Sequence, residues 1–252
     1  MSLPFSGLLL PRDGGADYTA SGVDYDGTND YATRGADLAG ISDGKAGIIS
    51  VWVRRDGSTG SDQRILRLTT AGGSATLSFL LTNSSDKFTL FGLNAAGSTI
   101  LGISTVATYA VSASWRHLLV SWDLAQASTT AKIYVDDTNT TSVTTHTNDT
   151  INYSSSGNVG VGANLDGTFK WHGCFSEMFF HTSYLDLSVE ANRRLFISAA
   201  GKPVNLGVDG STPLGVQPLL YVPNGDPSTN KGSGGNFTVS GTLDAASTSP
   251  SD

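Results

Sequence analysis

Short hydrophobic runs recur along most of the chain and are separated by polar turns that contain glycine. Many of these runs have the length and the β-branched or aromatic content of strands, namely 47–55, 63–69, 75–81, 87–93, 98–104, 115–123, 131–137, 158–163 and 169–181. Turn segments such as AGGS (71–74) and NLDG (164–167) supply the Gly and Asn residues that tight turns with positive φ require. This spacing predicts antiparallel hairpins packed as a β-sandwich.

Two of the runs indicate how their strands are covered. IISVWV (48–53) carries bulky apolar side chains at consecutive positions, which indicates a strand with both faces covered. In TAKIYVDD, Ile133 and Val135 alternate with Lys132 and Tyr134, which predicts a half-exposed strand.

One segment, LDLSVEANRRLFISAAGK (185–202), breaks the β pattern. Ser188 is a suitable N-cap, Phe196 would face a core, and Gly201 supplies a stop signal. These features predict one short helix of about three turns near 188–200.

Composition supports an all-β chain and narrows its partners. The 252 residues are 38% hydrophobic and only 15% charged, with 30 glycines, so we expect one large all-β domain. A net charge of −7 without a long basic run argues against nucleic acid, and no apolar run reaches the ~20 residues of a membrane span. The single cysteine, Cys174, excludes an intrachain disulfide and is expected to be a small buried side chain.

Acidic residues suited to catalysis are scarce. The chain has two glutamates, Glu177 and Glu190, and lacks the paired acids that glycoside hydrolysis needs. Its four histidines are scattered and accompany no nucleophile motif. We therefore expect no enzyme activity.

The acidic stretch VDYDGTNDYATRG (23–35) is interpreted first as a turn. Asp26-Gly27 is a turn dipeptide, Tyr25 and Tyr31 would pack, and nearby Asp and Asn side chains would cap the turn backbone. The alternative is a calcium site. The spacing does not fit a helix-loop-helix calcium loop, because such a loop needs Gly at its sixth position and Glu at its twelfth.

Four motifs in order carry a family resemblance: VDYDGTNDYATRG, GIISVWVRRDG, WRHLLVSWDLAQASTTAKIYVDD, and NVGVGANLDGTFKWHGCFSEMFFH. Together they resemble the laminin-G-like, pentraxin-like branch of the concanavalin A-like jelly rolls, over roughly residues 20–200. The resemblance implies a jelly-roll β-sandwich of two antiparallel sheets with one short helix.

The resemblance also implies, at most, one structural calcium ion. Related domains build it from an early-strand carboxylate and an acid on a late strand that commonly reads G-x-I-D-E. Here GCFSEMFF has Ser176 in place of that Asp, so one ligand of the family pattern is missing. The candidate ligands are Asp24, Asp26 and Glu177.

A lectin-like role would place a cell-surface glycan on an aromatic shelf with amide and carboxylate groups beside it. The candidate residues lie in or beside turns: Trp171, Tyr153, Tyr109, Asn164 and Asp166. The alternative is that Trp171 fills the core, as we expect of Trp52, Trp115 and Trp122.

Three further stretches, NDYATRGADLAGISDGKAGIISVWVRRDG, LSVEANRRLF and NKGSGGNFTVSGTLDAASTSPSD, are similar to structural proteins of tailed bacteriophages. This implies a non-enzymatic protein of the outer virion surface, either a capsid decoration protein or a tail or fibre component, that contacts other virion proteins and itself as a homo-oligomer.

The domain organisation expected on this basis has three parts. Residues 1–17 form an N-terminal docking arm, 18–202 form the sandwich, and 203–252 form an extension packed on the sandwich or on a neighbour. The arm would dock through apolar side chains, namely Leu3, Phe5, Leu8, Leu9 and Leu10.

Overall fold

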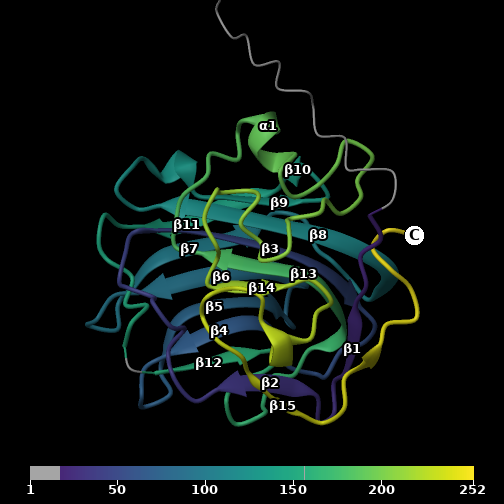
Figure 1. The fold of residues 1–252 in the computed structure, drawn as a ribbon. Helices are drawn as coiled ribbons and strands as arrows, with labels where there is room; N and C mark the ends of the chain where they lie inside the picture. Colours follow the sequence, from purple (N-terminus) through teal and green to yellow (C-terminus); the bar gives the residue numbers. More distant parts are fainter. Residues whose placement is uncertain (1–17, 156) are drawn as a thin grey trace, which may run out of the picture.

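Two antiparallel sheets face each other in the computed structural model, which describes residues 18–155 and 157–252 (Figure 1). Sheet A has the strand order β10 (Thr138–Asn139), β9 (Lys132–Val135), β8 (Ser112–Asp123), β3 (Ala46–Arg55), β13 (His172–His181), β1 (Val23–Asp26) and β16 (Asp244–Ala245). Strand β14 (Leu220–Val222) pairs with β13 in line with β1. The prediction of an all-β jelly-roll sandwich is confirmed.

Sheet B covers the inner face of sheet A. Its strand order is β11 (Thr141–His146), β7 (Thr99–Thr105), β6 (Lys87–Leu93), β5 (Ala75–Thr82), β4 (Gln63–Thr69), β12 (Asn158–Val161), β2 (Tyr31–Arg34) and β15 (Thr238–Ser240). Strand β6, KFTLFGL, alternates strictly between buried and half-buried positions, with Phe88 and Leu90 in the core. Such alternation directs one face of a strand toward the opposite sheet.

A second apolar cluster explains why IISVWV has no polar face. Ile49 and Val51 belong to the core between the sheets, whereas Ile48 belongs to a cluster on the outer face of sheet A. That cluster also contains Leu119, Tyr134, Phe179, Leu187, Phe196, Leu206 and Tyr221. Segments after β13 therefore cover the outside of the sheet, as the bulk at consecutive positions predicted.

The helix is much shorter than the sequence pattern predicted. Helix α1 spans Glu190–Arg193, a single turn. The only other helical segments in the described chain are the 3₁₀ turns Ser128–Thr130 and Pro227–Thr229. Ser188 does not cap it, because its Oγ donates to Asp186 Oδ1 at 2.6 Å. Phe196 does face a core: its ring packs edge-on against Phe179 with centroids 5.2 Å apart.

The last fifty residues add strands to both sheets rather than forming a separate unit. Strand β14 extends sheet A, β15 pairs with β2 in sheet B, and β16 pairs with β1 in sheet A. Near the end of the chain, Ser249 Oγ donates to Ala20 O at 2.6 Å and Ser251 Oγ accepts from Ala20 N at 3.0 Å. The predicted docking arm, with Leu3, Phe5, Leu8, Leu9 and Leu10, lies outside the described residues.

No helix within the described ranges is long and apolar enough to span a membrane.

Candidate functional site

The stretch that begins at Val23 forms strand β1 and a capped turn. Asp26 Oδ1 accepts the backbone N–H groups of Thr28 at 2.7 Å and Asn29 at 3.0 Å, while Gly27 takes a φ of 72°. Burial acts to raise the pKa of Asp26, but these backbone hydrogen bonds outweigh it and lower the pKa below its ordinary value. Asp26 is thus a turn-capping residue.

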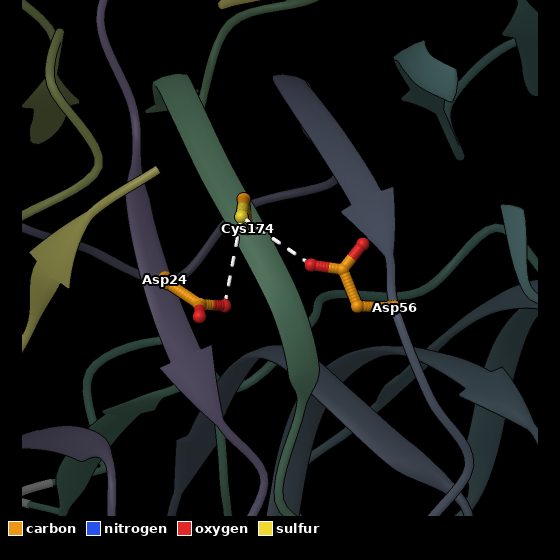
Figure 2. Close-up of side chains that lie close together, drawn as sticks. All are labelled: Asp24, Asp56 and Cys174. Atoms are coloured by element: carbon orange, nitrogen blue, oxygen red, sulfur yellow. Dashed lines mark hydrogen bonds between the residues drawn. The ribbon is translucent and has the colours of Figure 1, made fainter. Parts of the chain in front are cut away.

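A group of possible metal-ligand atoms does occur on sheet A, but it shares only Asp24 with the predicted set. Asp24 on β1, Cys174 on β13 and Asp56 after β3 bring one ligand atom each within 4.8 Å of one another. Figure 2 shows the two carboxylates on either side of the thiol. Cys174 Sγ lies 3.6 Å from Asp24 Oδ1 and 3.7 Å from Asp56 Oδ2.

The chemistry of this group does not fit calcium. Calcium takes six to eight oxygen ligands, whereas this group offers two carboxylates and a fully buried sulfur. Arg54 Nε and one terminal nitrogen each lie 2.7 Å from an oxygen of Asp56, so a positive charge already occupies that carboxylate. Burial strongly raises the pKa of the Cys174 thiol and keeps it protonated. The group is better described as a hydrogen-bonded cluster of two half-buried carboxylates around a buried thiol on sheet A.

Glu177 is not grouped with Asp24 and Asp26 as a set of metal-ligand atoms among the described residues. It sits in a bulge of β13 with a φ of 48°, and only 3% of the residue is exposed. Tyr18 donates to one of its oxygens, and Tyr221 Oη donates to the other at 3.3 Å. Burial raises the pKa of Glu177 to about 7, although both tyrosine hydrogen bonds act to lower it. A hollow of about 300 Å³ opens beside it.

Two of the predicted shelf residues belong to the core and cannot present a ring to a sugar. Trp171 is 0% exposed and stacks on Phe175 with centroids 5.1 Å apart. Tyr153 is 1% exposed, and its hydroxyl accepts from Trp122 Nε1 at 3.1 Å.

The expectation that Trp52, Trp115 and Trp122 fill the core is wrong for Trp115. Trp52 and Trp122 are buried, but Trp115 is half-buried, and its Nε1 donates to Thr248 Oγ1 at 3.0 Å.

Asn164 and Asp166 lie in the turn that the sequence assigned them to, and they organise it. Asn164 is 8% exposed and accepts from Arg64 Nε at 3.1 Å. Asp166 Oδ1 accepts from Thr168 Oγ1 at 2.6 Å. The exposed aromatic ring beside this turn is Phe169, 39% exposed, which sequence reasoning missed. Its φ of 56° is unusual for a bulky residue and left no local signal in the sequence.

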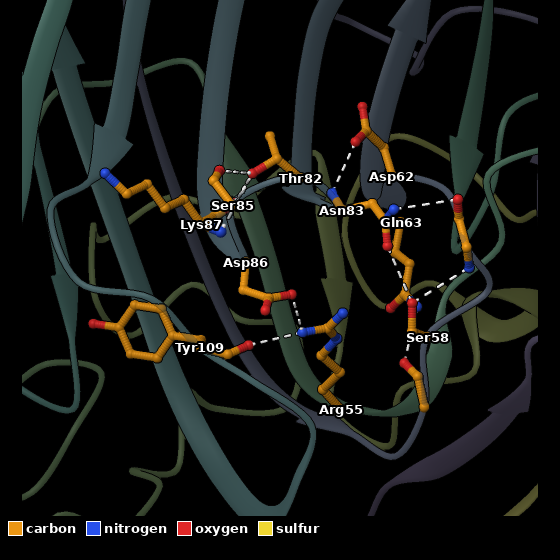
Figure 3. A network of polar contacts seen from close by, with 12 residues as sticks. Arg55, Ser58, Asp62, Gln63, Thr82, Asn83, Ser85, Asp86, Lys87 and Tyr109 are labelled. Carbon is orange, nitrogen blue, oxygen red and sulfur yellow. Dashed lines mark hydrogen bonds and ion pairs between the residues drawn. The ribbon is translucent and has the colours of Figure 1, made fainter.

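Tyr109 is the predicted shelf residue that lies beside open space. It follows β7 in a loop that other parts of the chain hold firmly, as Figure 3 shows. Its N–H donates to Asp86 O at 2.6 Å, and its carbonyl accepts from Arg55 at 3.0 Å. Arg55 also forms an ion pair with Asp86 at 2.6 Å, and the Tyr109 ring packs 5.1 Å from Phe88. Burial raises the pKa of the Tyr109 hydroxyl.

Two hollows flank Tyr109. One, of about 250 Å³, is lined by Val53, Arg55, Phe88, Thr108, Tyr109, Ala110, Val111, Ser112, Ser114 and Arg116. The other, of about 440 Å³, is lined by Val106, Ala107, Tyr109, Thr138, Asn139, Thr140 and Thr141. Both combine apolar side chains with hydroxyl or amide groups, which is the lining that small polar ligands require.

Comparisons with known proteins agree with this architecture. Residues 26–188 match the family model described as the concanavalin A-like lectin/glucanases superfamily. The native heptameric SAP-like pentraxin from Limulus polyphemus is similar in structure, with a TM-score of 0.56 and 12% identity over 90% of this chain and 95% of the pentraxin.

A proposed carbohydrate binding protein from Bacteroides ovatus is also similar, with a TM-score of 0.62 and 13% identity over 92% of this chain. The chain spans 62% of that protein's length. No curated protein matches the sequence.

At these identities the solved structures show a shared fold alone. The family match, in contrast, covers well over half of the 252 residues and includes strands of both sheets, from the β1 turn to the segment after β13. The chain therefore belongs to the concanavalin A-like lectin/glucanase superfamily.

Proposed function

We propose that the chain is a non-enzymatic, lectin-like module that binds glycans in the two hollows beside Tyr109. The observation that carries this proposal is a rigid, half-buried aromatic ring between two hollows of about 250 and 440 Å³. The similarity to a proposed carbohydrate binding protein agrees with it.

The chemistry around Tyr109 suits a sugar. A pyranose presents an apolar C–H face and a rim of hydroxyl groups, so it binds well where an aromatic ring adjoins fixed hydrogen-bonding groups. Thr138 and Asn139 supply such groups at exposed positions on one side of Tyr109, and Ser112 and Ser114 supply them on the other. Because the Tyr109 backbone is already fixed by Arg55 and Asp86, little ordering cost would remain on binding.

Two exposed alanines allow each hollow to be filled without disturbing the core. Ala107→Arg would fill the larger hollow and Ala110→Arg the smaller one, whereas Ala96→Arg places the same side chain in the exposed turn between β6 and β7. A glycan array identifies the sugar, and calorimetry then compares the variants. At least one hollow variant should bind the sugar about tenfold more weakly or worse, with Ala96→Arg unchanged. An array without a hit, or full binding by both hollow variants, would refute the proposal.

We also propose that the module leaves its ligand chemically intact. The two glutamates lie apart: Glu177 is enclosed between two tyrosines inside the β13 bulge, and Glu190 is exposed on α1. Neither forms the facing acid pair that glycoside hydrolysis uses. New reducing ends released from a bound polysaccharide, and lost in Glu177→Gln, would overturn this part.

For its biological setting, we propose that the module is carried on the outer surface of a tailed phage or phage-like particle, on the capsid or on the tail. Support comes from the three sequence stretches that resemble phage structural proteins and from the net charge of −7, which does not favour contact with DNA. Mass spectrometry of purified particles, with antibody labelling in electron micrographs, tests this directly. Absence of the chain from particles would end the proposal.

Contacts with other virion proteins and with further copies of the chain are part of the same proposal. The similar Limulus pentraxin is heptameric, which agrees with assembly of this fold into homo-oligomers. We propose that residues 1–17 mediate docking through their five large apolar side chains. Deletion of residues 2–17 should leave a folded sandwich that no longer assembles, as judged by light scattering. Equal assembly by the truncated chain would remove the arm from the proposal.

A further inference from the structure

Two arginines on β4 share a single neutral acceptor. Arg64 Nε donates to Asn164 Oδ1 at 3.1 Å, and an Arg67 terminal nitrogen donates to the same oxygen. Both side chains are half-buried. The ion pairs among the described residues involve other arginines, and no carboxylate oxygen of those residues lies within 4.0 Å of either of these two guanidinium groups.

The hydrogen-bonding capacity of the pair is only partly used. Arg67 donates a second hydrogen bond to Gly73 O at 3.0 Å, but its Nε is buried and has no partner. The terminal nitrogens of Arg64 make no hydrogen bond within the described chain, and its guanidinium lies 5.0 Å from the centre of the Phe169 ring. The unpaired terminal nitrogens of the pair thus belong to Arg64, and such a guanidinium edge matches the planar geometry of a carboxylate.

Electrostatics at the pair also favour an anion. Burial, and next the neighbouring charge of Arg67, lower the pKa of Arg64. The carboxylates that act on the pair are Asp62 and Asp166, and each is engaged elsewhere. Asp62 accepts from Asn83 N at 2.9 Å, and Asp166 accepts from Thr168 Oγ1 at 2.6 Å.

Phe169 supplies the apolar part of the arrangement. Phe169 is 39% exposed as a residue although Arg64 lies over its ring, so the residue is not fully covered and can contact a ligand. Its left-handed backbone, with a φ of 56°, is costly for a bulky residue and holds the ring beside the arginines. An open aromatic surface next to two guanidinium groups is the chemistry of a charged sugar site.

We propose that Arg64, Arg67 and Phe169 form a second binding site, which takes the carboxylate of an acidic sugar and packs its ring against Phe169. This site does not depend on the hollows beside Tyr109, since none of its residues lines them.

The test uses the full chain, arginine Nε–Hε signals in NMR spectra, and three probes at low ionic strength: trigalacturonic acid, its methyl ester and inorganic sulfate. The acid should shift the Arg64 and Arg67 signals, and it should bind at least about tenfold more tightly than the ester or sulfate. Arg67→Met, which keeps an unbranched apolar stem, should weaken binding of the acid by a similar factor. Asp166→Asn should tighten it about two- to fivefold, because it removes a negative charge that acts on Arg67 and would repel the ligand.

Two kinds of control distinguish binding at this site from nonspecific attraction to positive charge and from binding in the hollows beside Tyr109. Lys45→Gln removes one positive charge beside Asn148 and should leave binding within about twofold. Ala107→Arg and Ala110→Arg should not weaken binding, so a failure of the Tyr109 proposal leaves this one standing. The proposal is overturned if the acid binds no more tightly than the ester, or no more tightly than sulfate. It is also overturned if the arginine signals do not move, or if Lys45→Gln and Arg67→Met weaken binding of the acid equally. If Arg67→Met does not fold, the ester and Asp166→Asn comparisons still decide.

Discussion

Glu177 should make the stability of the protein depend on pH in a way that one substitution abolishes. Its folded-state pKa is raised from 4.5 to about 7 because the carboxyl group is enclosed. The folded protein therefore holds this proton more tightly than the unfolded chain does. The resulting stabilisation is fully present below about pH 4.5 and is lost as the pH rises through about 7.

The size of the effect follows from the distance between the two pKa values. At roughly 1.4 kcal/mol for each pH unit, the interval from 4.5 to about 7 corresponds to about 3 kcal/mol of unfolding free energy. Glu177→Gln cannot titrate, and its amide retains an acceptor and a donor for the hydroxyls of Tyr18 and Tyr221. As the pH rises from 4.5 to about 8, the unfolding free energy of the variant should therefore increase by up to about 3 kcal/mol relative to that of the wild type.

Urea denaturation followed by tryptophan fluorescence at several pH values measures this difference. Glu190→Gln is the matched control, because the Glu190 side chain is 66% exposed and meets Arg194 only in an exposed pair. It should leave the pH profile within about 0.5 kcal/mol of the wild type. Parallel profiles for the wild type and Glu177→Gln would refute the assignment of a perturbed, enclosed carboxyl group to Glu177.

Three other outcomes are expected. Cys174 should resist iodoacetamide in the folded protein and react once urea unfolds it, because the thiol is 0% exposed and its pKa is strongly raised by burial; rapid labelling of the folded protein would contradict its position. Excess chelator should move the melting temperature by less than about 1 °C, because Asp24 and Asp56 offer calcium too few oxygens; a fall of about 5 °C or more would show a bound ion. Phe196→Ala should cost about 3 kcal/mol in urea denaturation, whereas Val208→Ala, at a position 94% exposed, should cost almost nothing; equal losses would place Phe196 outside the second cluster.

The strands of the sandwich could be read from the sequence because their signal is local. The alternation in KFTLFGL and the bulk in IISVWV follow directly from which faces are covered. Strands β14 to β16 gave no comparable signal, since they have two or three residues each and depend on partners far along the chain. The helix was overestimated because the residues after Arg193 have helical character but turn back, and Ile197 bridges to Pro203.

The candidate sites were harder to predict because they depend on register and on backbone conformation. Asp24 meets Cys174 only through the pairing of β1 with β13, about 150 positions apart. Trp171 was given the exposed role because it lies beside a turn, whereas the exposed aromatic residue is Phe169, whose own backbone is left-handed. Tyr109, which does line two hollows, could be named as a candidate because an aromatic residue beside a turn between strands is a local feature.

The hydrogen bonds of Ser249 and Ser251 with Ala20 have a consequence for the connectivity of the chain. Asp252 lies one residue beyond Ser251, and Tyr18 lies two residues before Ala20, so a linker of a few residues could join 252 to 18 at about 3.5 Å per residue. New ends could then be opened in the polar turn 56–62 between β3 and β4. A circular permutant made this way would keep every strand pairing of both sheets, with β1 and β16 joined within one continuous segment.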